Sequence, residues 1–209
     1  MTPAPVGFDL DMTLIDSRAA IMASFAGVAA DTGVVIDPAG VDSRLGIKLQ
    51  DELAHWFPPG EIENAMRIYR SYYLRLLAPL TTRLPGAPEA IAAVRAAGAR
   101  AVVITAKPEV TARLSLDSVG LAPDELFGEA HGPEKAAVLT ALGAAVYVGD
   151  TPADMQAAVA AGARAVGVAT GSFSASELRA AGAVHVLHSL DGFPALYASL
   201  AARGLTTRG

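Results

Sequence analysis

Two carboxylates directly follow a short apolar run near the start of the chain, and this placement restricts what the chain can fold into. Asp9 and Asp11 come just after Val6-Gly7-Phe8. Side chains alternate faces along an extended chain, so the two carboxylates project together while Leu10 points into packing. Such a pair predicts either a bound metal ion or one acid that retains its proton. An alternative interpretation is a strand ending in a solvated turn, with Asp11 and Thr13 bonding local backbone.

Length and hydrophobicity favour one domain with an insertion. The 209 residues suffice for one buried core plus a subdomain, but not for two large independent domains. The uncharged stretch from Ala136 to Gly149 is shorter than the roughly 20 residues of a membrane span. The N-terminus has neither a basic start nor an apolar signal segment. We therefore expect a soluble, cytoplasmic protein with no membrane partner, and a chain that frays after Ala202.

Charge and cysteine content exclude several classes of protein. The formal net charge of −5 argues against a nucleic-acid partner, because binding a phosphate backbone needs a concentrated basic surface. The chain has no cysteine, which excludes disulfides, thiolate metal sites and cysteine nucleophiles. The four histidines lack ligand spacing, so carboxylates are the remaining strong metal ligands.

From Pro85 onward, alanine-rich helical stretches alternate with short β-branched runs. The helical stretches are 88–97, 135–142 and 153–161, and the runs are 101–105, 145–148 and 165–168. Gly98, Gly143 and Gly162 each follow a helical stretch, where a left-handed residue ends a helix. Strands that are apolar on both faces and alternate with helices predict an α/β fold with a Rossmann-like parallel sheet covered on both faces.

A segment with a different pattern of apolar residues lies between the first predicted strand and the rest of the sheet. Apolar residues at helical spacing run from Asp16 to about Thr82 without a strand pattern, and Leu84-Pro85-Gly86 marks a turn at its end. We predict a core formed by residues 1–15 and 83–209, and an inserted all-α cap of three or four helices at 16–82. Tyr69, Tyr72 and Tyr73 are expected to pack within this cap.

Polar residues stand at the carboxyl ends of the predicted strands, where ligands bind in parallel α/β sheets. Thr105 ends one run, Asp150 ends another, and Asp154 follows one helical turn later. With Asp9 and Asp11 this makes four acids without histidine, which predicts an all-oxygen site for Mg2+ rather than zinc. Helix capping by Thr151 or Asp150, with Asp154 on a solvated face, is the alternative.

Two further residues have a functional and an ordinary interpretation. Thr105 can donate its hydroxyl to a phosphoryl oxygen, or can simply end a β-branched strand. Lys135 precedes a helix and can supply a cation for a nucleophilic carboxylate and a phosphoryl group, or can be a solvated lysine. Lys107 competes with Lys135 for this role.

These residues together resemble the four motifs of the haloacid dehalogenase superfamily, and the match covers essentially the whole chain. The segment from Asp9 to Ser17 is similar to the first motif, the run ending in Thr105 to the second, Lys135 to the third, and Gly149-Asp150 with Asp154 to the fourth. The resemblance is closest to the phosphoglycolate phosphatase-like branch, which carries a helical cap at the same place. It implies a Rossmann-like core and Mg2+-dependent phosphate ester hydrolysis.

The resemblance also implies a role for each residue. Asp9 would attack phosphorus and form an aspartyl-phosphate, and Asp11 would protonate the leaving oxygen and then activate water. Thr105 and Lys135 would hold the transferred group, Ala106 would contact the substrate, and Thr13 would orient Asp11 or the loop after it. Asp9, the backbone carbonyl of Asp11 and Asp150 would bind Mg2+, with Asp154 binding directly or through water.

The chain departs from the family pattern at two places. Met12 stands where the family usually has glycine, which disfavours a positive φ in the loop after the first strand. The segment Gly132-Pro133-Glu134-Lys135 lacks the prolines that often follow the lysine of the third motif. In the cap, the segment from Arg44 to Leu49 resembles the branch's specificity loop. Arg44 or Lys48 is a candidate for binding a distal anionic group, or both are solvated charges beside a turn.

We therefore expect a phosphatase for a small-molecule phosphate ester, either phosphoglycolate-like or a sugar phosphate. A phosphomutase of the same branch is the first alternative. A dehalogenase or phosphonate hydrolase is disfavoured because Asp11 is present. From other classes, a phosphoryl-accepting receiver domain or a non-catalytic binding relative is conceivable, and the inserted cap argues against the receiver. The oligomeric state is not predicted.

Overall fold

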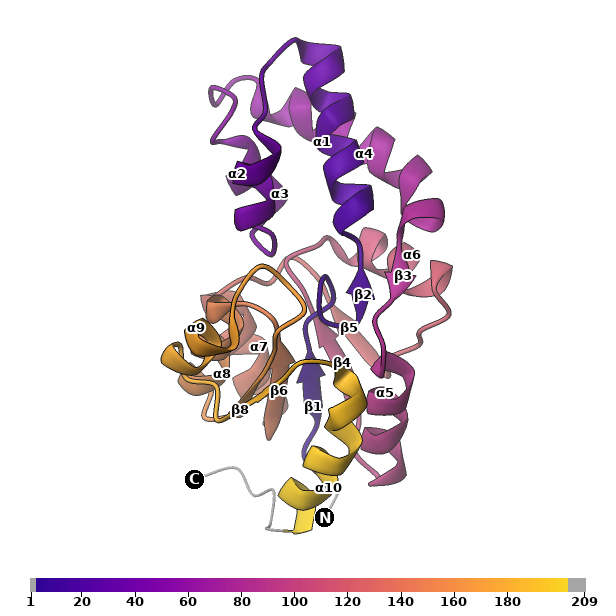
Figure 1. The fold of residues 1–209 in the computed structure, drawn as a ribbon, viewed down its shortest axis with the longest axis vertical. Helices are drawn as coiled ribbons and strands as arrows, with labels where there is room; N and C mark the ends of the chain where they lie inside the picture. The colour runs from indigo at the N-terminus through magenta and orange to yellow at the C-terminus, as the bar shows by residue number, and fades with distance from the viewer. Residues whose placement is uncertain (1–2, 203–209) are drawn as a thin grey trace.

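A parallel sheet organises the core of the protein. The computed structural model describes residues 3–202. Its main sheet contains β1 (Val6–Phe8), β4 (Ala101–Ile104), β5 (Glu125–Phe127), β6 (Val146–Gly149), β7 (Arg164–Val168) and β8 (His185–Leu187). The strands lie in the order β5-β4-β1-β6-β7-β8, and every pair is parallel. Because β1 is central, residues that follow it lie beside the ends of both β4 and β6 (Figure 1).

Helices cover both faces of this sheet, as the sequence predicts. One face packs against α5 (Ala87–Ala96), α6 (Glu109–Ser118) and α10 (Phe193–Ala202), which follows the short 3-10 helix η1 (Leu190–Gly192). The other packs against α7 (Pro133–Leu142), α8 (Pro152–Ala160) and α9 (Ala175–Ala180). Strand β6 shows the alternation: Val146 and Val148 join the first hydrophobic cluster, and Tyr147 joins the second.

The predicted α/β architecture is therefore confirmed, and three helix ends have the expected geometry. Gly98, Gly143 and Gly162 have φ values of 76°, 61° and 72°, in the left-handed region that glycine adopts without strain. The expected fraying after Ala202 concerns residues outside the described range.

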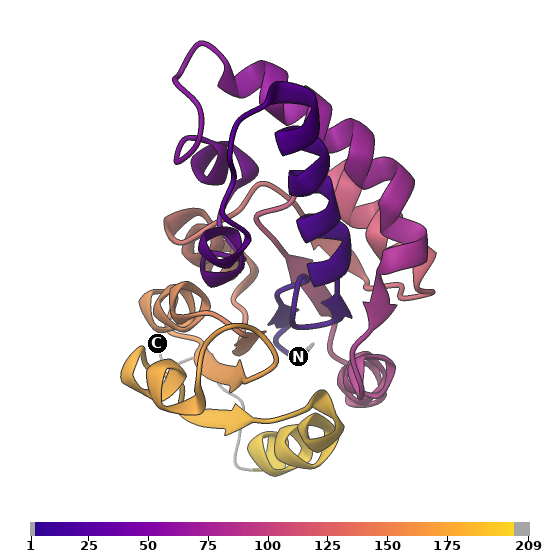
Figure 2. The same cartoon turned by 45° about the horizontal axis from the view of Figure 1, so that its top comes forward.

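The segment between β2 (Ile15–Asp16) and β3 (Thr82–Arg83) forms a separate helical layer above the carboxyl ends of the strands of the main sheet (Figures 1 and 2). It contains α1 (Arg18–Thr32), α2 (Pro38–Ser43), α3 (Leu49–Leu53) and α4 (Ile62–Leu80), and the two-stranded sheet of β2 and β3 connects it to the core. These helices share their own hydrophobic cluster, which includes Phe25, Leu53 and Tyr73. We call this layer the cap. The boundaries 15/16 and 82/83 stay predictions.

None of the helices in residues 3–202 combines the length and the apolar character needed to cross a bilayer.

Helices α1 and α4 of the cap pack closely together at Gly27. A Cβ at this position would lie 2.6 Å from ring carbons of Tyr72, so alanine does not fit without a shift. We expect Gly27→Ala to lower the free energy of unfolding by about 1–3 kcal/mol, although alanine normally stabilises a helix by about 1 kcal/mol over glycine. Urea denaturation measures this change.

The control is the same substitution in a Tyr72→Ala background, where the ring is gone and the change should be neutral or stabilising. A more stable Gly27→Ala protein in the wild-type background would contradict the close packing.

Candidate active site

Asp9 lies immediately after β1 and is held at the centre of the sheet edge. Its backbone N–H donates to the carbonyl of Val148 in β6 (2.8 Å), and only 3% of the residue is exposed. The chain then turns back, because the N–H groups of Leu14 and Ile15 both donate to the carbonyl of Leu10. Asp9 is therefore fixed in the core, whereas Asp11 lies in the turn.

Asp150 and Asp154 reach the same edge from β6 and α8. Thr151 and Asp154 form a reciprocal capping box at the start of α8, with Pro152 in the first helical turn. The capping interpretation of this segment is thus correct for Thr151, but Asp154 is not on a solvated face, since it is 1% exposed. Its Oδ2 accepts from Thr151, while its Oδ1 accepts from Lys135.

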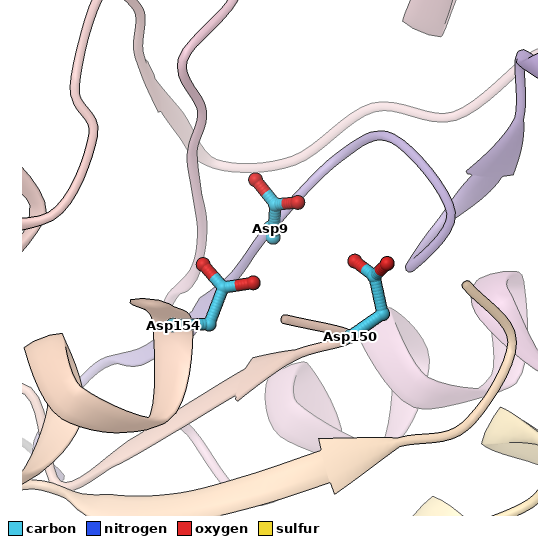
Figure 3. A group of neighbouring side chains, drawn as sticks. All are labelled: Asp9, Asp150 and Asp154. Carbon is cyan, nitrogen blue, oxygen red and sulfur yellow. The ribbon is translucent and has the colours of Figure 1, made fainter. Parts of the chain in front are cut away.

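Three of the four predicted acids converge. Carboxylate oxygens of Asp9, Asp150 and Asp154 lie within 4.8 Å of one another, and all three residues are buried (Figure 3). We call them the acid cluster. Lys135 Nζ donates to Asp9 Oδ1 (2.7 Å) and to Asp154 Oδ1 (2.6 Å), and is itself 3% exposed. Lys135 is therefore part of the site and not a solvated lysine.

Burial and the repulsion between the carboxylates raise pKa values within the acid cluster. Burial raises the pKa of Asp9 to about 7; Lys135 opposes this rise and the charge of Asp154 adds to it. Burial and the charges of Asp9 and Asp154 raise the pKa of Asp150 well above its usual range. Burial disfavours a charged Lys135, but the charges of Asp154 and Asp9 outweigh that effect and raise its pKa. One ammonium thus faces three carboxylates.

These residues fit a hard divalent cation. The cluster is buried, all its ligand atoms are oxygens, and its three carboxyl groups outnumber its single lysine. Gly171 also packs against it, since a Cβ there would overlap Asp150 Oδ2.

Of the two roles expected for Thr13, orienting Asp11 or orienting the loop after it, the structure does not show a bond to Asp11. The hydroxyl of Thr13 donates to Asp150 Oδ1 (3.0 Å) and not to Asp11, because the tight turn after Leu10 carries Thr13 toward the end of β6. Thr13 therefore links the loop of the first motif to the acid cluster. Together with the buried partners of Asp11 below, this bond excludes the solvated-turn interpretation.

Asp11 lies outside the acid cluster and has its own cation. Lys107 Nζ donates to Asp11 Oδ1 (2.7 Å) and to the hydroxyl of Tyr73 (2.7 Å), and Ser17 donates to the same carboxylate oxygen. Burial opposes a charged Lys107, but Asp11 and Tyr73 raise its pKa overall. Lys107 and Lys135 thus do not compete for one role, because Lys107 binds Asp11 whereas Lys135 binds Asp9 and Asp154.

Met12 takes the conformation that its side chain disfavours. Its φ is 58°, in the left-handed region where a side chain costs about 1–2 kcal/mol. The hydroxyl of Thr170 donates to the carbonyl of Met12, and the side chain of Met12 is buried in the hydrophobic cluster of the cap. These contacts compensate for the backbone strain, so the loop keeps the positive φ without glycine.

A cavity of about 250 Å³ separates the cap from the strand ends. Asp9, Asp11, Thr105, Ala106 and Lys107 line its core side. Thr105 is buried at the end of β4, and its hydroxyl accepts from the N–H of Lys107 (3.2 Å).

The two cap cations proposed for substrate binding already have partners. Arg44 lines the cavity but forms a bidentate pair with Glu52, with both bonds at 2.7 Å. Lys48 pairs with Glu134 of the core (2.7 Å). Their role in binding an anion stays a prediction.

Sequence reasoning missed several residues of the site. The sequence did not place Tyr73 beside Lys107 or Ser17 beside Asp11. It also did not place Tyr147 beside Asp154, whose Oδ1 accepts from the tyrosine hydroxyl (3.4 Å). Of these residues, only Tyr147 could have been placed from the sequence. Alternation along its strand puts its side chain on the opposite face of the sheet from Val146 and Val148.

The fold and the buried acids define a Rossmann-like hydrolase with a cap, and comparison with known proteins agrees. Residues 6–158 match the model of the haloacid dehalogenase-like hydrolase family. The chain therefore belongs to the haloacid dehalogenase-like hydrolase family.

Similar proteins include one curated sequence and many solved structures. The chain is 27% identical to the probable phosphatase IndB of Dickeya dadantii, over 91% of this chain and 97% of that one. A structure described as a predicted phosphatase from Clostridium acetobutylicum has a TM-score of 0.82 at 23% identity, covering 96% of this chain and 100% of its own. A haloacid dehalogenase-like hydrolase from Streptococcus pneumoniae has a TM-score of 0.80 at 21% identity, covering 94% and 99%. These structural similarities establish the fold.

Repulsion between the acids of the cluster should have a measurable effect on the stability of the protein. In metal-free buffer near pH 8, we expect Asp150→Asn to stabilise the protein by about 1–2 kcal/mol, because it removes one mutually repelling buried carboxylate. We also expect Mg2+ to raise the Tm of the wild type and the variant to lose most of that rise. Differential scanning fluorimetry with EDTA or Mg2+ measures both effects.

Asp117→Asn on the exposed side of α6 is the matched control and should behave like the wild type in both buffers. A destabilised metal-free Asp150→Asn protein that still responds fully to Mg2+ would contradict the assignment.

Proposed function

We propose that this protein is a Mg2+-dependent phosphatase that hydrolyses a small-molecule phosphate monoester through an aspartyl-phosphate at Asp9. The observation that carries the proposal is the position of Asp9: it belongs to the buried acid cluster, it is bonded to Lys135, and it lines the cavity. The phosphatase name of the curated relative supports the same activity.

The first step would transfer the phosphoryl group to the enzyme. Lys135 holds Oδ1 of Asp9, which leaves Oδ2 to attack phosphorus. The ester P–O bond breaks, and Asp11 protonates the departing alcohol oxygen. Thr105 at the end of β4 and Lys135 would hold the phosphoryl oxygens, whose charge must be compensated in the transition state.

The second step would release phosphate. Asp11, now ionised, takes a proton from water as that water attacks phosphorus, and the bond between phosphorus and Asp9 breaks. Lys107 holds the carboxylate of Asp11 in place for both proton transfers.

Mg2+, when bound, would neutralise negative charge on the nucleophile and on the phosphoryl oxygens. Asp9, Asp150 and the backbone carbonyl of Asp11 would hold it, with Asp154 contributing directly or through water.

Hydrolysis fits the cavity better than a phosphomutase reaction does. A mutase must rebind a doubly phosphorylated sugar with its second phosphate at the far end of the site. Of the two arginines that line the cavity from the cap, Arg44 is neutralised by Glu52 and Arg70 is exposed to water. The cavity of about 250 Å³ is also below the roughly 300–1,000 Å³ typical of ligand sites.

The central test is the removal of the nucleophile. With p-nitrophenyl phosphate and Mg2+, we expect Asp9→Asn to lower kcat by about 10³-fold or more, because no carboxylate oxygen remains to attack phosphorus. Steady-state kinetics measures the loss, and circular dichroism shows whether the variant is folded.

Asp11→Asn provides the comparison. It should lower kcat by about 10²–10⁴-fold and let a phosphorylated enzyme accumulate after rapid quenching, since its second step lacks a base. Equal turnover by wild type and folded Asp9→Asn protein would eliminate Asp9 as the nucleophile.

A further inference from the structure

The cavity has one polar end, and its other walls are mainly apolar. Its polar end is the catalytic side, with Asp9, Asp11, Thr105 and Lys107. The cap contributes a wall of Ile21, Phe25, Val41, Leu45, Ile47 and Leu49. A substrate whose phosphate is at Asp9 would therefore place its alcohol portion against hydrocarbon and aromatic surface.

The charged groups near these walls do not favour an anionic or polar alcohol portion. Glu52 is 5% exposed, and it accepts from both Arg44 and the indole N–H of Trp56 (2.9 Å). A substrate carboxylate beside Arg44 would meet an ion pair in which Glu52 already compensates the charge of the arginine. Arg70 also lines the cavity, but it is exposed to water and belongs to the opening.

Apart from Arg70, the opening of the cavity is mainly apolar. Of the six large apolar side chains that are most exposed within residues 3–202, three line this cavity: Val110 (75% exposed), Leu74 (52%) and Leu114 (41%). They come from α4 and α6, which pack against each other across the junction of cap and core. Exposed apolar side chains gathered at a cavity mark a binding surface, whereas isolated ones do not.

From this geometry we propose that the substrate is a phosphate monoester of an apolar alcohol, whose chain or ring fills the space under the cap and extends toward the opening between α4 and α6. This inference rests on the proposed phosphatase function and replaces phosphoglycolate and sugar phosphates as the expected substrates. The hydroxyls of a sugar would lose water without adequate partners in such walls, while an alkyl or aryl group gains from burial.

A series of alkyl phosphates tests the proposal without changing the reactivity of the leaving group. We expect kcat/KM to rise roughly fourfold per methylene from ethyl to butyl phosphate, about 15-fold in total, and to rise further to hexyl phosphate. The values for 2-phosphoglycolate and glucose 6-phosphate should lie below that for butyl phosphate.

The possible failures are distinguishable. If 2-phosphoglycolate or glucose 6-phosphate is hydrolysed as efficiently as hexyl phosphate, or if kcat/KM is flat across the series, the substrate class is wrong while the phosphatase function stands. If neither these esters nor p-nitrophenyl phosphate is hydrolysed with Mg2+, both proposals are wrong.

Substitutions at the opening test whether the alkyl chain of the substrate lies there. Val110→Ser and Leu114→Ser should lower the ratio of kcat/KM for hexyl over ethyl phosphate by about three- to tenfold each, because they remove apolar contact from the longer chain alone. Both side chains are exposed, so the fold should tolerate the changes.

Val159→Ser is the matched control, since Val159 is also a helical valine, 57% exposed, but lies on α8 outside the cavity lining. This variant should keep the wild-type ratio. An unchanged ratio in both opening variants, or an equal fall in Val159→Ser, would overturn the proposed path of the substrate.

Discussion

The buried ammonium of Lys135 is the interaction on which the rest of the site depends. It lies between Asp9 and Asp154 and so joins the first turn of α7 to the end of β1 and the start of α8. An isolated charge in this position would be strongly disfavoured, but a paired one fixes its partners in a single geometry. Within residues 3–202, Lys135 donates to Asp9 and Asp154 but not to Asp150, which leaves Asp150 to the cation that we propose.

The core strands were predictable from sequence, whereas the sheet edges were not. The central strands β1, β4 and β6 are buried on both faces and form continuous apolar runs. The edge strands β5 and β8 are only three residues long and half-buried, and they begin with Glu125 and His185. Such strands lack the apolar signature, so sequence periodicity did not reveal them.

The acids of the site were also predictable, because each follows a strand or begins a helix. Their partners were not, because these lie far apart in the chain: Thr13 and Asp150 are separated by 137 residues, and Lys107 and Asp11 by 96. The motifs showed which groups carry charge. Only the fold shows that Arg44 is neutralised by Glu52, which changes the class of substrate that the cap favours.

Met12 joins two parts of the molecule that a glycine would leave independent. Its backbone belongs to the turn between Asp11 and Thr13, but its side chain is a member of the cap's hydrophobic cluster. A cap that lifts away from the sheet must either withdraw this side chain from its apolar surroundings or pull the turn along. The position of the cap and the geometry of the turn that carries Asp11 are therefore mechanically coupled through this one side chain.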